Sequence, residues 1–338
     1  MALKASTRAM EEWEEYFAQN PAPPGHSHHC GDMEAFCQRH VGHHPIALVT
    51  SGGTTVPLER NTVRFVDNFS AGTRGAASTE YFLQQGYAVI FIHATSPSLP
   101  SCVTSTPGSY WRPCRRGRAA CCSSHHNTLA RCIPSGVSTS RSRLGRLLWL
   151  TFTSLSDYLW LLRSATQCLQ RLAPKALLYL AAAVSDFYIP QDEISEHKIQ
   201  SESGPLTVRL QLVPKMLRPL VSVWGPELYV VSFKLETDEK KLIEKATAAL
   251  RKYKHDLVIG NLLQTRRDEV TLVTERESSL LRLTEHQKAE RIEIERLIVE
   301  EVCSRHRPER GHAIPLAKLC HPSTMLQDVG RLLSHAYA

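Results

Sequence analysis

The chain has 338 residues, of which 42% are hydrophobic, which is enough for one large globular domain or two modest ones. No apolar stretch approaches the roughly 20 residues that a membrane-spanning helix needs. The net charge of +7 suggests a nucleic-acid partner. However, residues 101–150 hold eight of the 40 basic residues, all of them arginine, and no acidic residue. The rest of the chain therefore has 32 basic and 33 acidic residues. Outside that one segment the chain is about neutral, which argues against nucleic-acid binding.

Residues 1–45 carry four glutamates at positions 11–15, which argue against a secretory signal or transit peptide and favour a cytosolic (cytoplasmic) location, with nuclear entry left open. Short helices are predicted over Met10–Ala18 and Asp32–Val41, with a proline-rich loop from Asn20 to Gly25. The histidines and cysteines between residues 26 and 44 raise the possibility of zinc. Their spacing matches no familiar zinc pattern, so we favour a His-rich loop and predict no metal site. The ten cysteines form no C-x-x-C pair and are expected to be reduced thiols in the cytosol.

Residues 46–95 show an alternation of strand and helix. A buried strand is predicted over Ile46–Thr50, a helix over residues 75–85 and a second strand over Ala88–His93. Near-continuous apolar strands that alternate with helices are typical of a parallel sheet covered on both faces. This segment therefore indicates an α/β fold.

Residues 97–146 do not continue the pattern. They are rich in arginine, serine and cysteine, show no periodicity and lack lysine, aspartate and glutamate. Three interpretations stay open: a surface insertion or disordered loop, a basic RNA-binding loop, or an aberrant translation from a shifted frame or wrong splice. We favour the aberrant translation, with the loop second, and assign no function to this segment.

The alternation resumes after residue 147. Helices are predicted over Thr153–Leu172, Lys215–Val223, Asp238–Lys252 and Glu285–Cys303, and strands over Ala176–Ala183, Leu228–Phe233, Leu257–Ile259 and Glu269–Thr274, with an alternating segment at Val208–Leu212. One mostly parallel sheet is therefore expected to run through both halves of the chain.

Polar and small residues follow the predicted strands at the points where each strand ends, and ligands of open α/β sheets bind beyond the carboxyl ends of strands. The glycines of Ser51-Gly52-Gly53-Thr54 and of Ser70-Ala71-Gly72-Thr73-Arg74-Gly75 would free backbone N–H groups to bind a phosphate. Each of these motifs also has a purely structural explanation as a tight turn or a helix cap. The G-x-G-x-x-G fingerprint, the Walker lysine, G-x-S-x-G and H-E-x-x-H are all missing, which weakens the dehydrogenase, P-loop ATPase, serine hydrolase and zinc protease alternatives.

Several ordered motifs closely resemble those of the phosphopantothenate-cysteine ligase family in its free-standing eukaryotic form. The resemblance covers roughly residues 46–96 and 147–305. The matching motifs are Val49–Thr54 with Val56–Glu59, Val63–Ser70 with Gly72 and Gly75, Leu180–Tyr188, Glu196–Gln200, Val213–Lys215 and Ser232–Thr237. The resemblance implies a Rossmann-like, three-layer α/β fold with a mostly parallel sheet and a smaller β-containing extension, and it implies a homodimer.

The resemblance further implies a ligase that joins 4'-phosphopantothenate to L-cysteine in coenzyme A biosynthesis, through an acyl-nucleotide intermediate. ATP is the expected co-substrate, with CTP possible and Mg²⁺ bound to the triphosphate. By resemblance, the nucleotide contacts would be Gly52, Ser70, Gly72, Gly75, Phe233 and Asn261. The phosphopantothenate contacts would be Asn68, Ala182, Ala183 and Asp186, with Arg64 donated by the neighbouring subunit.

Asn68 and Lys198 are the expected catalytic residues. An amide donates hydrogen bonds to an acyl phosphate without adding a competing nucleophile, which suits Asn68. Lys198 lies where bacterial relatives carry a lysine-rich lid, but the segment here is less basic, so Lys215 and Lys234 stay as alternatives.

The expected domain organisation is an N-terminal helix and His-rich loop (1–45), a ligase domain (46–306) interrupted at 97–146, and a C-terminal tail (307–338). The departures at 97–146 leave a second function open, that of a catalytically silent protein that binds nucleotide or phosphopantothenate.

Overall fold

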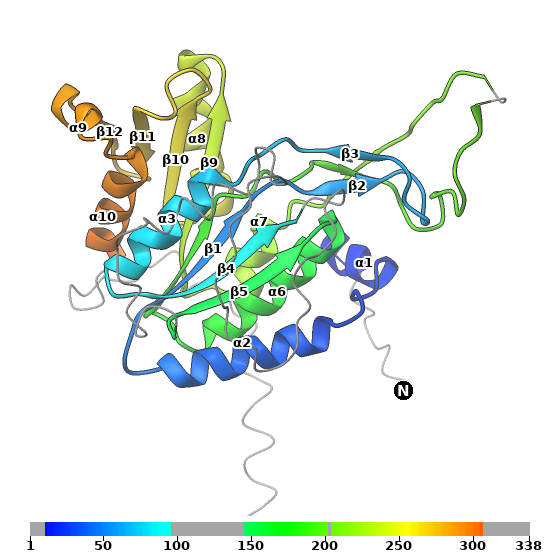
Figure 1. Ribbon diagram of the computed structural model, residues 1–338, viewed down its shortest axis with the longest axis horizontal. Helices are drawn as coiled ribbons and strands as arrows, with labels where there is room; N and C mark the ends of the chain where they lie inside the picture. The colour runs from blue at the N-terminus through cyan, green and yellow to red at the C-terminus, as the bar shows by residue number, and fades with distance from the viewer. Residues whose placement is uncertain (1–10, 96–144, 202–203, 307–338) are drawn as a thin grey trace, which may run out of the picture. The chain divides into compact units, whose positions relative to one another are not determined.

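An eight-stranded sheet in the order β12-β11-β10-β9-β6-β1-β4-β5 forms the centre of the structure (Figure 1). The computed structural model describes residues 11–95, 145–201 and 204–306, which all fall in one compact unit. The strands of the sheet are β1 (Ile46–Ser51), β4 (Ala88–Ala94), β5 (Leu147–Phe152), β6 (Ala176–Leu180), β9 (Tyr229–Glu236), β10 (Leu257–Leu262), β11 (Glu269–Val273) and β12 (Ser278–Arg282).

The six strands from β10 to β5 are parallel, and β11 and β12 add an antiparallel edge. Strand β1 lies between β4 and β6, where the order of the strands reverses, and all six of its residues are buried. In open parallel sheets, a reversal of this kind leaves a crevice at the carboxyl ends of the strands. The topology therefore predicts where a ligand binds before any side chain is considered.

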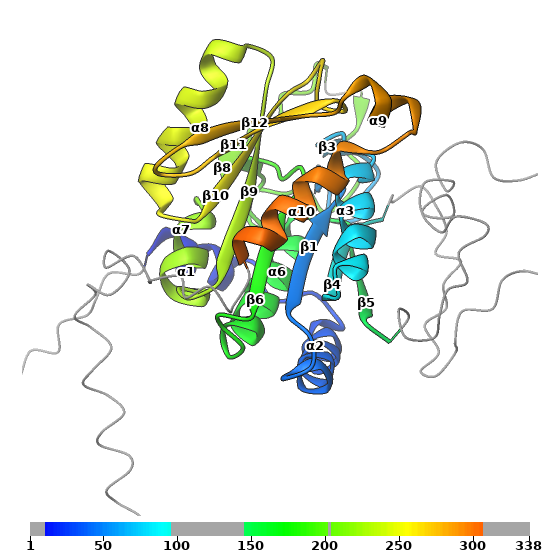
Figure 2. The ribbon, with the colours of Figure 1, turned by 90° about the vertical axis from the view of Figure 1, so that its left-hand side faces the viewer.

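Helices cover both faces of the sheet, giving three layers. The helices are α1 (Glu12–Gln19), α2 (His26–His40), α3 (Thr73–Gln84), α6 (Leu155–Gln170), α7 (Leu217–Pro219), the π-helical segment η2 (Leu220–Trp224), α8 (Glu239–Tyr253), α9 (Glu285–Ala289) and α10 (Ile294–His306). Helices α3 and α10 pack side by side on one face (Figure 2), whereas α1, α2, α6 and η2 share the core of the other face.

The side chains of β1 point alternately to the two faces of the sheet, so this one strand contributes to both cores. Ile46 and Leu48 belong to the core under α2 and α6, and Ala47 and Val49 to the core under α3 and α10. This arrangement confirms the predicted α/β, Rossmann-like three-layer fold. No helix among the described residues is long and apolar enough to cross a bilayer.

Two small antiparallel pairs build an arm that projects from the sheet (Figure 1). The pairs are β2 (Thr55–Pro57) with β3 (Phe65–Asp67), and β7 (Phe187–Tyr188) with β8 (Gln211–Leu212). Along the arm, residues 59–61 also pair with residues 195–196. These elements are the smaller β-containing extension that the resemblance implies.

The N-terminal prediction of a His-rich loop was wrong, because His26–His40 form one helix. Gly25 has a left-handed φ of +82° and turns the chain into α2, so the loop ends there. Helix α2 buries Met33 and Phe36 in the same core as α6. Residues 1–45 thus contribute two helices to the central unit.

Two predicted helices are interrupted. The segment 285–303 divides into α9 and α10 because Arg291 has a φ of +57°, a left-handed conformation that a helix does not continue through. The segment 215–223 becomes α7 followed by η2. Strands β2, β3, β5, β7 and β12 were not predicted as strands. The atypical segment, apart from Gly145 and Arg146, and the C-terminal tail lie outside the described residues.

Candidate active site

The loop after β1 runs beside the loop after β6 at the carboxyl end of the sheet. The backbone N–H of Ala183 donates to the carbonyl of Gly52 at 2.8 Å, and the N–H of Thr54 donates to the carbonyl of Ala183 at 3.1 Å. Strand β6 ends at Leu180 rather than at the predicted Ala183, because Ala182 donates to the Thr50 hydroxyl at 3.2 Å. The structure therefore brings the Gly52 motif and the Ala182-Ala183 motif together.

The backbone of Asn68 packs against the loop after β1. Its N–H donates to the carbonyl of Thr54 at 3.1 Å. The carbonyl of Asn68 lies so close to Gly53 that a Cβ added there would overlap it. Gly53 is therefore the residue that lets the Asn68 segment approach the end of β1.

A second turn precedes α3 and packs against the end of β1. The Ser51 hydroxyl donates to the carbonyl of Gly72 at 2.8 Å, and Gly72 has a left-handed φ of +70°. A Cβ on Gly75 would lie 2.5 Å from the Ser51 Cβ. No side-chain hydrogen bond caps the first turn of α3, and uncapped N–H groups at a helix N-terminus are able to bind an anion.

Phe233 and Asn261 lie on neighbouring strands β9 and β10, on the other side of the strand-order reversal. The Phe233 ring packs edge-on against Tyr179 with centroids 5.0 Å apart. Asn261 is only 6% exposed, and within the described residues its Oδ1 has no hydrogen-bond partner. A buried acceptor without a partner is costly, which suits a ligand that supplies a donor.

Of the three candidate lysines, Lys215 forms an ion pair with a predicted site residue. Its Nζ is 2.9 Å from the carboxylate of Asp186, and both side chains are more than half exposed. Lys234 instead faces Glu236 at 3.8 Å. Exposed pairs of this kind contribute little to stability, so the Lys215–Asp186 pair is free to rearrange around a ligand.

Arg64 and Lys198 belong to segments of the arm that Glu59 joins. The Arg64 guanidinium donates to Glu59 at 2.8 Å and to the carbonyl of Ile199 at 3.1 Å. The Glu59 side chain is fully buried; burial raises its pKa, but hydrogen bonds from Arg64, Val63 and Ile199 outweigh burial and lower the pKa overall. Glu59 therefore fastens the segment that carries Lys198 to the hairpin that carries Arg64.

His93 closes the site on the β4 side. A Cβ on Gly72 would lie 3.3 Å from its ring, and the rings of Phe91 and Trp149 are 5.4 Å and 5.9 Å away. Burial lowers the pKa of His93, and a hydrogen bond with the Ser51 backbone opposes this only in part. His93 is consequently a neutral imidazole against the Gly72 turn at physiological pH.

We expect His93→Gln to flatten the dependence of stability on pH. In the wild type the unfolded chain takes up a proton below the ordinary histidine pKa of about 6.5, before folded His93 does, so the free energy of unfolding falls as pH falls through this window. Denaturant unfolding at about pH 7.5 and about pH 5.5 measures the difference, which should be smaller in the variant. His26→Gln, on α2, is a second test of the same kind, because burial also lowers the pKa of His26 and predicts a similar flattening. An unchanged pH difference in His93→Gln would contradict the assignment of His93.

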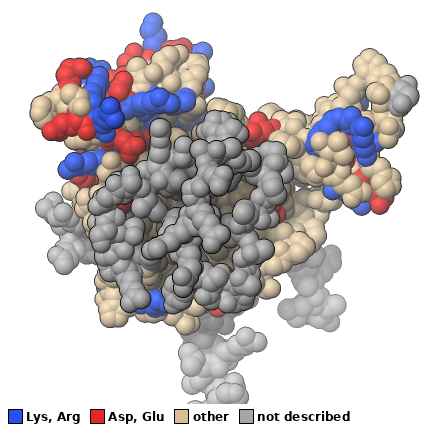
Figure 3. Space-filling model, in the orientation of Figure 1, with Lys and Arg blue, Asp and Glu red and all other residues tan. Residues whose placement is uncertain are grey.

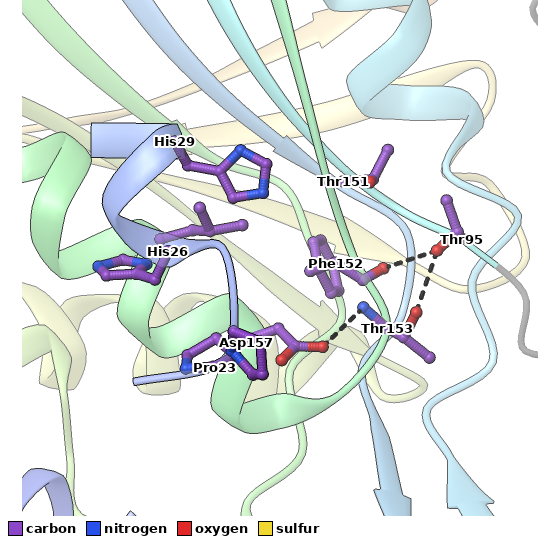
Figure 4. A pocket seen from close by; sticks show the side chains of 10 residues that line it. Pro23, His26, His29, Thr95, Thr151, Phe152, Thr153 and Asp157 are labelled. Atoms are coloured by element: carbon purple, nitrogen blue, oxygen red, sulfur yellow. Dashed lines mark hydrogen bonds between the residues drawn. The ribbon is translucent and has the colours of Figure 1, made fainter. Parts of the chain in front are cut away.

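A polar cavity of about 270 Å³ lies on the β5 side, near the start of α2 (Figure 4). The Asp157 carboxylate in its wall accepts from the Thr153 N–H at 3.3 Å, and the Thr95 and Thr153 hydroxyls are 3.0 Å apart. Asp157 is committed to capping α6, in a capping box with Ser154. None of the predicted site residues lines this cavity, and the described residues contain no cluster of three or more metal-binding side chains.

Sequence reasoning missed three residues that build the site. Gly53 and Arg74 were named only within their glycine motifs, without a role of their own, and His93 only as the last residue of a predicted strand. Arg74 donates to the carbonyl of Arg266 at 2.6 Å, 192 positions away along the chain, and no local pattern predicts such a contact. The one available signal was the position of all three residues at strand ends or in glycine turns.

The fold and the topology of the sheet define an α/β protein of the Rossmann-like class. The model of the family described as DNA/pantothenate metabolism flavoprotein, C-terminal domain, matches residues 163–304. The human phosphopantothenate–cysteine ligase is 42% identical over 297 residues, covering 86% of this chain and 95% of the relative. The Saccharomyces cerevisiae phosphopantothenate–cysteine ligase CAB2 is 39% identical over 328 residues, covering 87% and 86%.

Solved structures give the same result. A histidine-to-alanine mutant of Cab2 superposes with a TM-score of 0.73 at 40% identity, covering 88% of this chain and 97% of the other. The complex of that mutant with phosphopantothenate-cysteine superposes with a TM-score of 0.71 at 41% identity, covering 87% and 97%. The chain belongs to the phosphopantothenate–cysteine ligase family, whose members are enzymes that form a carbon–nitrogen bond.

Proposed function

We propose that this protein is an ATP-dependent ligase that joins 4'-phosphopantothenate to L-cysteine and gives 4'-phosphopantothenoylcysteine for coenzyme A biosynthesis. The observation that carries the proposal is the likeness, over 87% of the chain, to a Cab2 mutant in complex with phosphopantothenate-cysteine. The turns after β1 and β6 and before α3 support it, because they offer backbone N–H groups to phosphates. The cytoplasm is the proposed compartment, and residues 46–306 the proposed ligase domain.

The proposed reaction has two steps. The substrate carboxylate attacks the α-phosphorus of the nucleotide, a P–O bond forms, and the bond to the leaving pyrophosphate breaks. The cysteine amine then attacks the acyl carbon, a C–N bond forms, the nucleoside monophosphate leaves with the bonding electrons, and the amine loses a proton. Neither step needs elaborate acid–base machinery, so positioning and electrostatics are expected to provide most of the catalysis.

The residues divide between the two substrates. The nucleotide is assigned to Gly52, Ser70, Gly72, Gly75, Phe233 and Asn261. 4'-Phosphopantothenate is assigned to Asn68, Ala182, Ala183 and Asp186. Mg²⁺ bound to the triphosphate would screen phosphate charge, and none of the residues of this chain is assigned to it.

The catalytic assignment rests on Asn68 and Lys198. Asn68 lies beside the end of β1, where its amide would donate to the reacting carboxyl group. Lys198 is proposed to close over the phosphates from the arm. Lys215 is the alternative, because it already pairs with Asp186.

A homodimer with Arg64 donated across the interface is also proposed. The arm exposes large apolar side chains, including Phe65 (39%), Val66 (40%) and Leu212 (67%), and an arm of this kind suits burial against a second copy. Arg64 belongs to the arm, which projects from the sheet, and this position suits donation to the partner's site.

A mixed-subunit experiment tests this donation. We expect Arg64→Ala and Asn68→Asp each to be nearly inactive, and co-expression of the two to restore about a quarter of wild-type activity, because half of the dimers would be mixed and each would hold one intact site. Separately purified variants that are not allowed to exchange subunits are the control. Activity that stays at the level of the single variants would place Arg64 in the site of its own chain.

The test of the function is pyrophosphate release by the purified protein with 4'-phosphopantothenate and cysteine. ATP and CTP are run in parallel, and each substrate is omitted in turn. Release that requires phosphopantothenate, together with the conjugate detected by mass spectrometry, supports the ligase and reports the nucleotide preference. A folded protein that releases no pyrophosphate would instead be the catalytically silent protein that binds nucleotide or phosphopantothenate.

A further inference from the structure

Arg74 joins three elements that are far apart in the sequence. It lies in the first turn of α3, and its side chain is 16% exposed. One guanidinium nitrogen donates to the carbonyl of Arg266, in the turn between β10 and β11, at 2.6 Å. Another is 3.2 Å from the carboxylate of Glu295 at the start of α10, which is 14% exposed. The start of α3 is thereby tied to the β10–β11 turn.

The same guanidinium lies over the ring of Phe233, 5.8 Å from its centroid. Phe233 is half-buried, so its ring is held by Arg74 and by the edge contact with Tyr179. Arg74 therefore contacts both the helix start that faces the phosphates and the aromatic residue assigned to the nucleotide.

The β10–β11 turn held by Arg74 carries a second unused polar group. Within the described residues, the Thr265 hydroxyl is buried without a hydrogen-bond partner, as is the Oδ1 of Asn261. Buried polar groups are normally hydrogen-bonded, so two unpaired oxygen atoms near the end of one strand suggest a site where a polar ligand would supply the missing hydrogen bonds. An exocyclic amino group, which adenine and cytosine both carry, is a donor of the required kind.

We propose that Arg74 is a positioning residue for the nucleotide: it fixes Phe233 and the Asn261–Thr265 strand end, where the base binds, relative to the Gly72–Gly75 turn, where the phosphates bind. The proposal rests on the proposed function and adds to it a residue that holds the two ends of the nucleotide site at a fixed separation. Within the described residues Nη1 makes no hydrogen bond and lies only in ion-pair distance of Glu295, so the positioning role rests on the hydrogen bond to Arg266 and the contacts with Glu295 and Phe233.

The decisive measurement separates nucleotide affinity from turnover. For Arg74→Met we expect the nucleotide KM to rise about tenfold or more. The value of kcat at saturating nucleotide should change by less than about threefold, and the KM for 4'-phosphopantothenate should stay the same. This pattern is expected because only the positioning of the bound nucleotide in the ground state is lost. Arg74→Lys should recover little of the loss, because an ammonium group lacks the planar fork that reaches two partners. Arg296→Met, in an exposed pair with Glu300 on α10, is the matched control.

A second variant guards against loss of fold. Arg74→Met leaves Glu295 buried without its cation, whereas Arg74→Met/Glu295→Gln removes both charges, and both should show the same rise in nucleotide KM. Glu295→Gln alone keeps the guanidinium but frees it, and it should raise the nucleotide KM in part. A drop in kcat of about 100-fold at saturating nucleotide with Arg74→Met, and no effect of Glu295→Gln, would overturn the proposal in favour of direct phosphate contact.

Direct binding keeps this test independent of ligase activity. Calorimetric titration of the wild type and Arg74→Met with ATP and with CTP, each with Mg²⁺, should show the same loss of affinity. If the wild type binds nucleotide but makes no conjugate, the ligase proposal fails while the role of Arg74 is still tested by the change in Kd. Equal affinities in the wild type and Arg74→Met, or no nucleotide binding by the wild type, would overturn the inference.

Discussion

Replacing Asn68 by aspartate is expected to lower kcat by about 100-fold or more, the range found when a donor to a developing negative charge is removed. The change is nearly isosteric, so the backbone hydrogen bond from Asn68 to Thr54 should survive. In the proposed site it would replace an amide donor by an anion facing the substrate carboxylate and the nucleotide phosphates. Initial rates at saturating ATP, 4'-phosphopantothenate and cysteine measure the loss.

The control is Gln38→Glu, which makes the same change from amide to carboxylate at an exposed position on α2. It should leave kcat unchanged, and both variants should keep the wild-type unfolding midpoint. Asn68→Ser, which removes the amide without adding charge, should lose less activity than Asn68→Asp. Near-normal turnover of Asn68→Asp would remove Asn68 from the catalytic role.

The strand-end motifs could be predicted from the sequence because parallel topology makes their convergence almost obligatory. Once the strands after Pro45 and after Lys175 are placed in one parallel sheet, Gly52 and Ala183 must leave it at the same edge. In the structure the backbone of Ala183 donates a hydrogen bond to Gly52 and accepts one from Thr54. This part of the site follows from the period and polarity of short segments.

The arm could not be predicted in the same way. Its strands are two or three residues long, too short for a periodic pattern, and it is held by a buried Glu59 whose partners include Ile199, 140 positions away. The break between α9 and α10 was missed for a different reason, since the positive φ of Arg291 occurs at a residue that favours helices. In each case a tertiary contact or a local conformation overrides the local pattern.

Gly53→Ala is expected to be the most damaging change by a single methyl group in the site, and to lower kcat/KM by at least about 100-fold. The added Cβ would overlap the carbonyl of Asn68 and displace that residue. A displacement of about 1 Å is enough for a loss of this size when a reacting group must be positioned. The obstructing atom is backbone, so no side-chain rotation relieves the overlap. Strand pairing between Gly53 and Ala183 holds the other side. The chain must therefore shift the segment that carries Asn68.

The same overlap should lower the free energy of unfolding by about 1–3 kcal/mol, as overpacking does elsewhere. Gly31→Ala is the matched control: Gly31 lies in α2, nothing lies within 4 Å of an added Cβ, and alanine is the better helix former, so stability should rise by up to about 1 kcal/mol. Denaturant unfolding and ligase rates on both variants separate the two effects. If Gly53→Ala retained full kcat/KM, the close approach of Asn68 to β1 would be dispensable, and with it the argument that this glycine turn positions the catalytic amide.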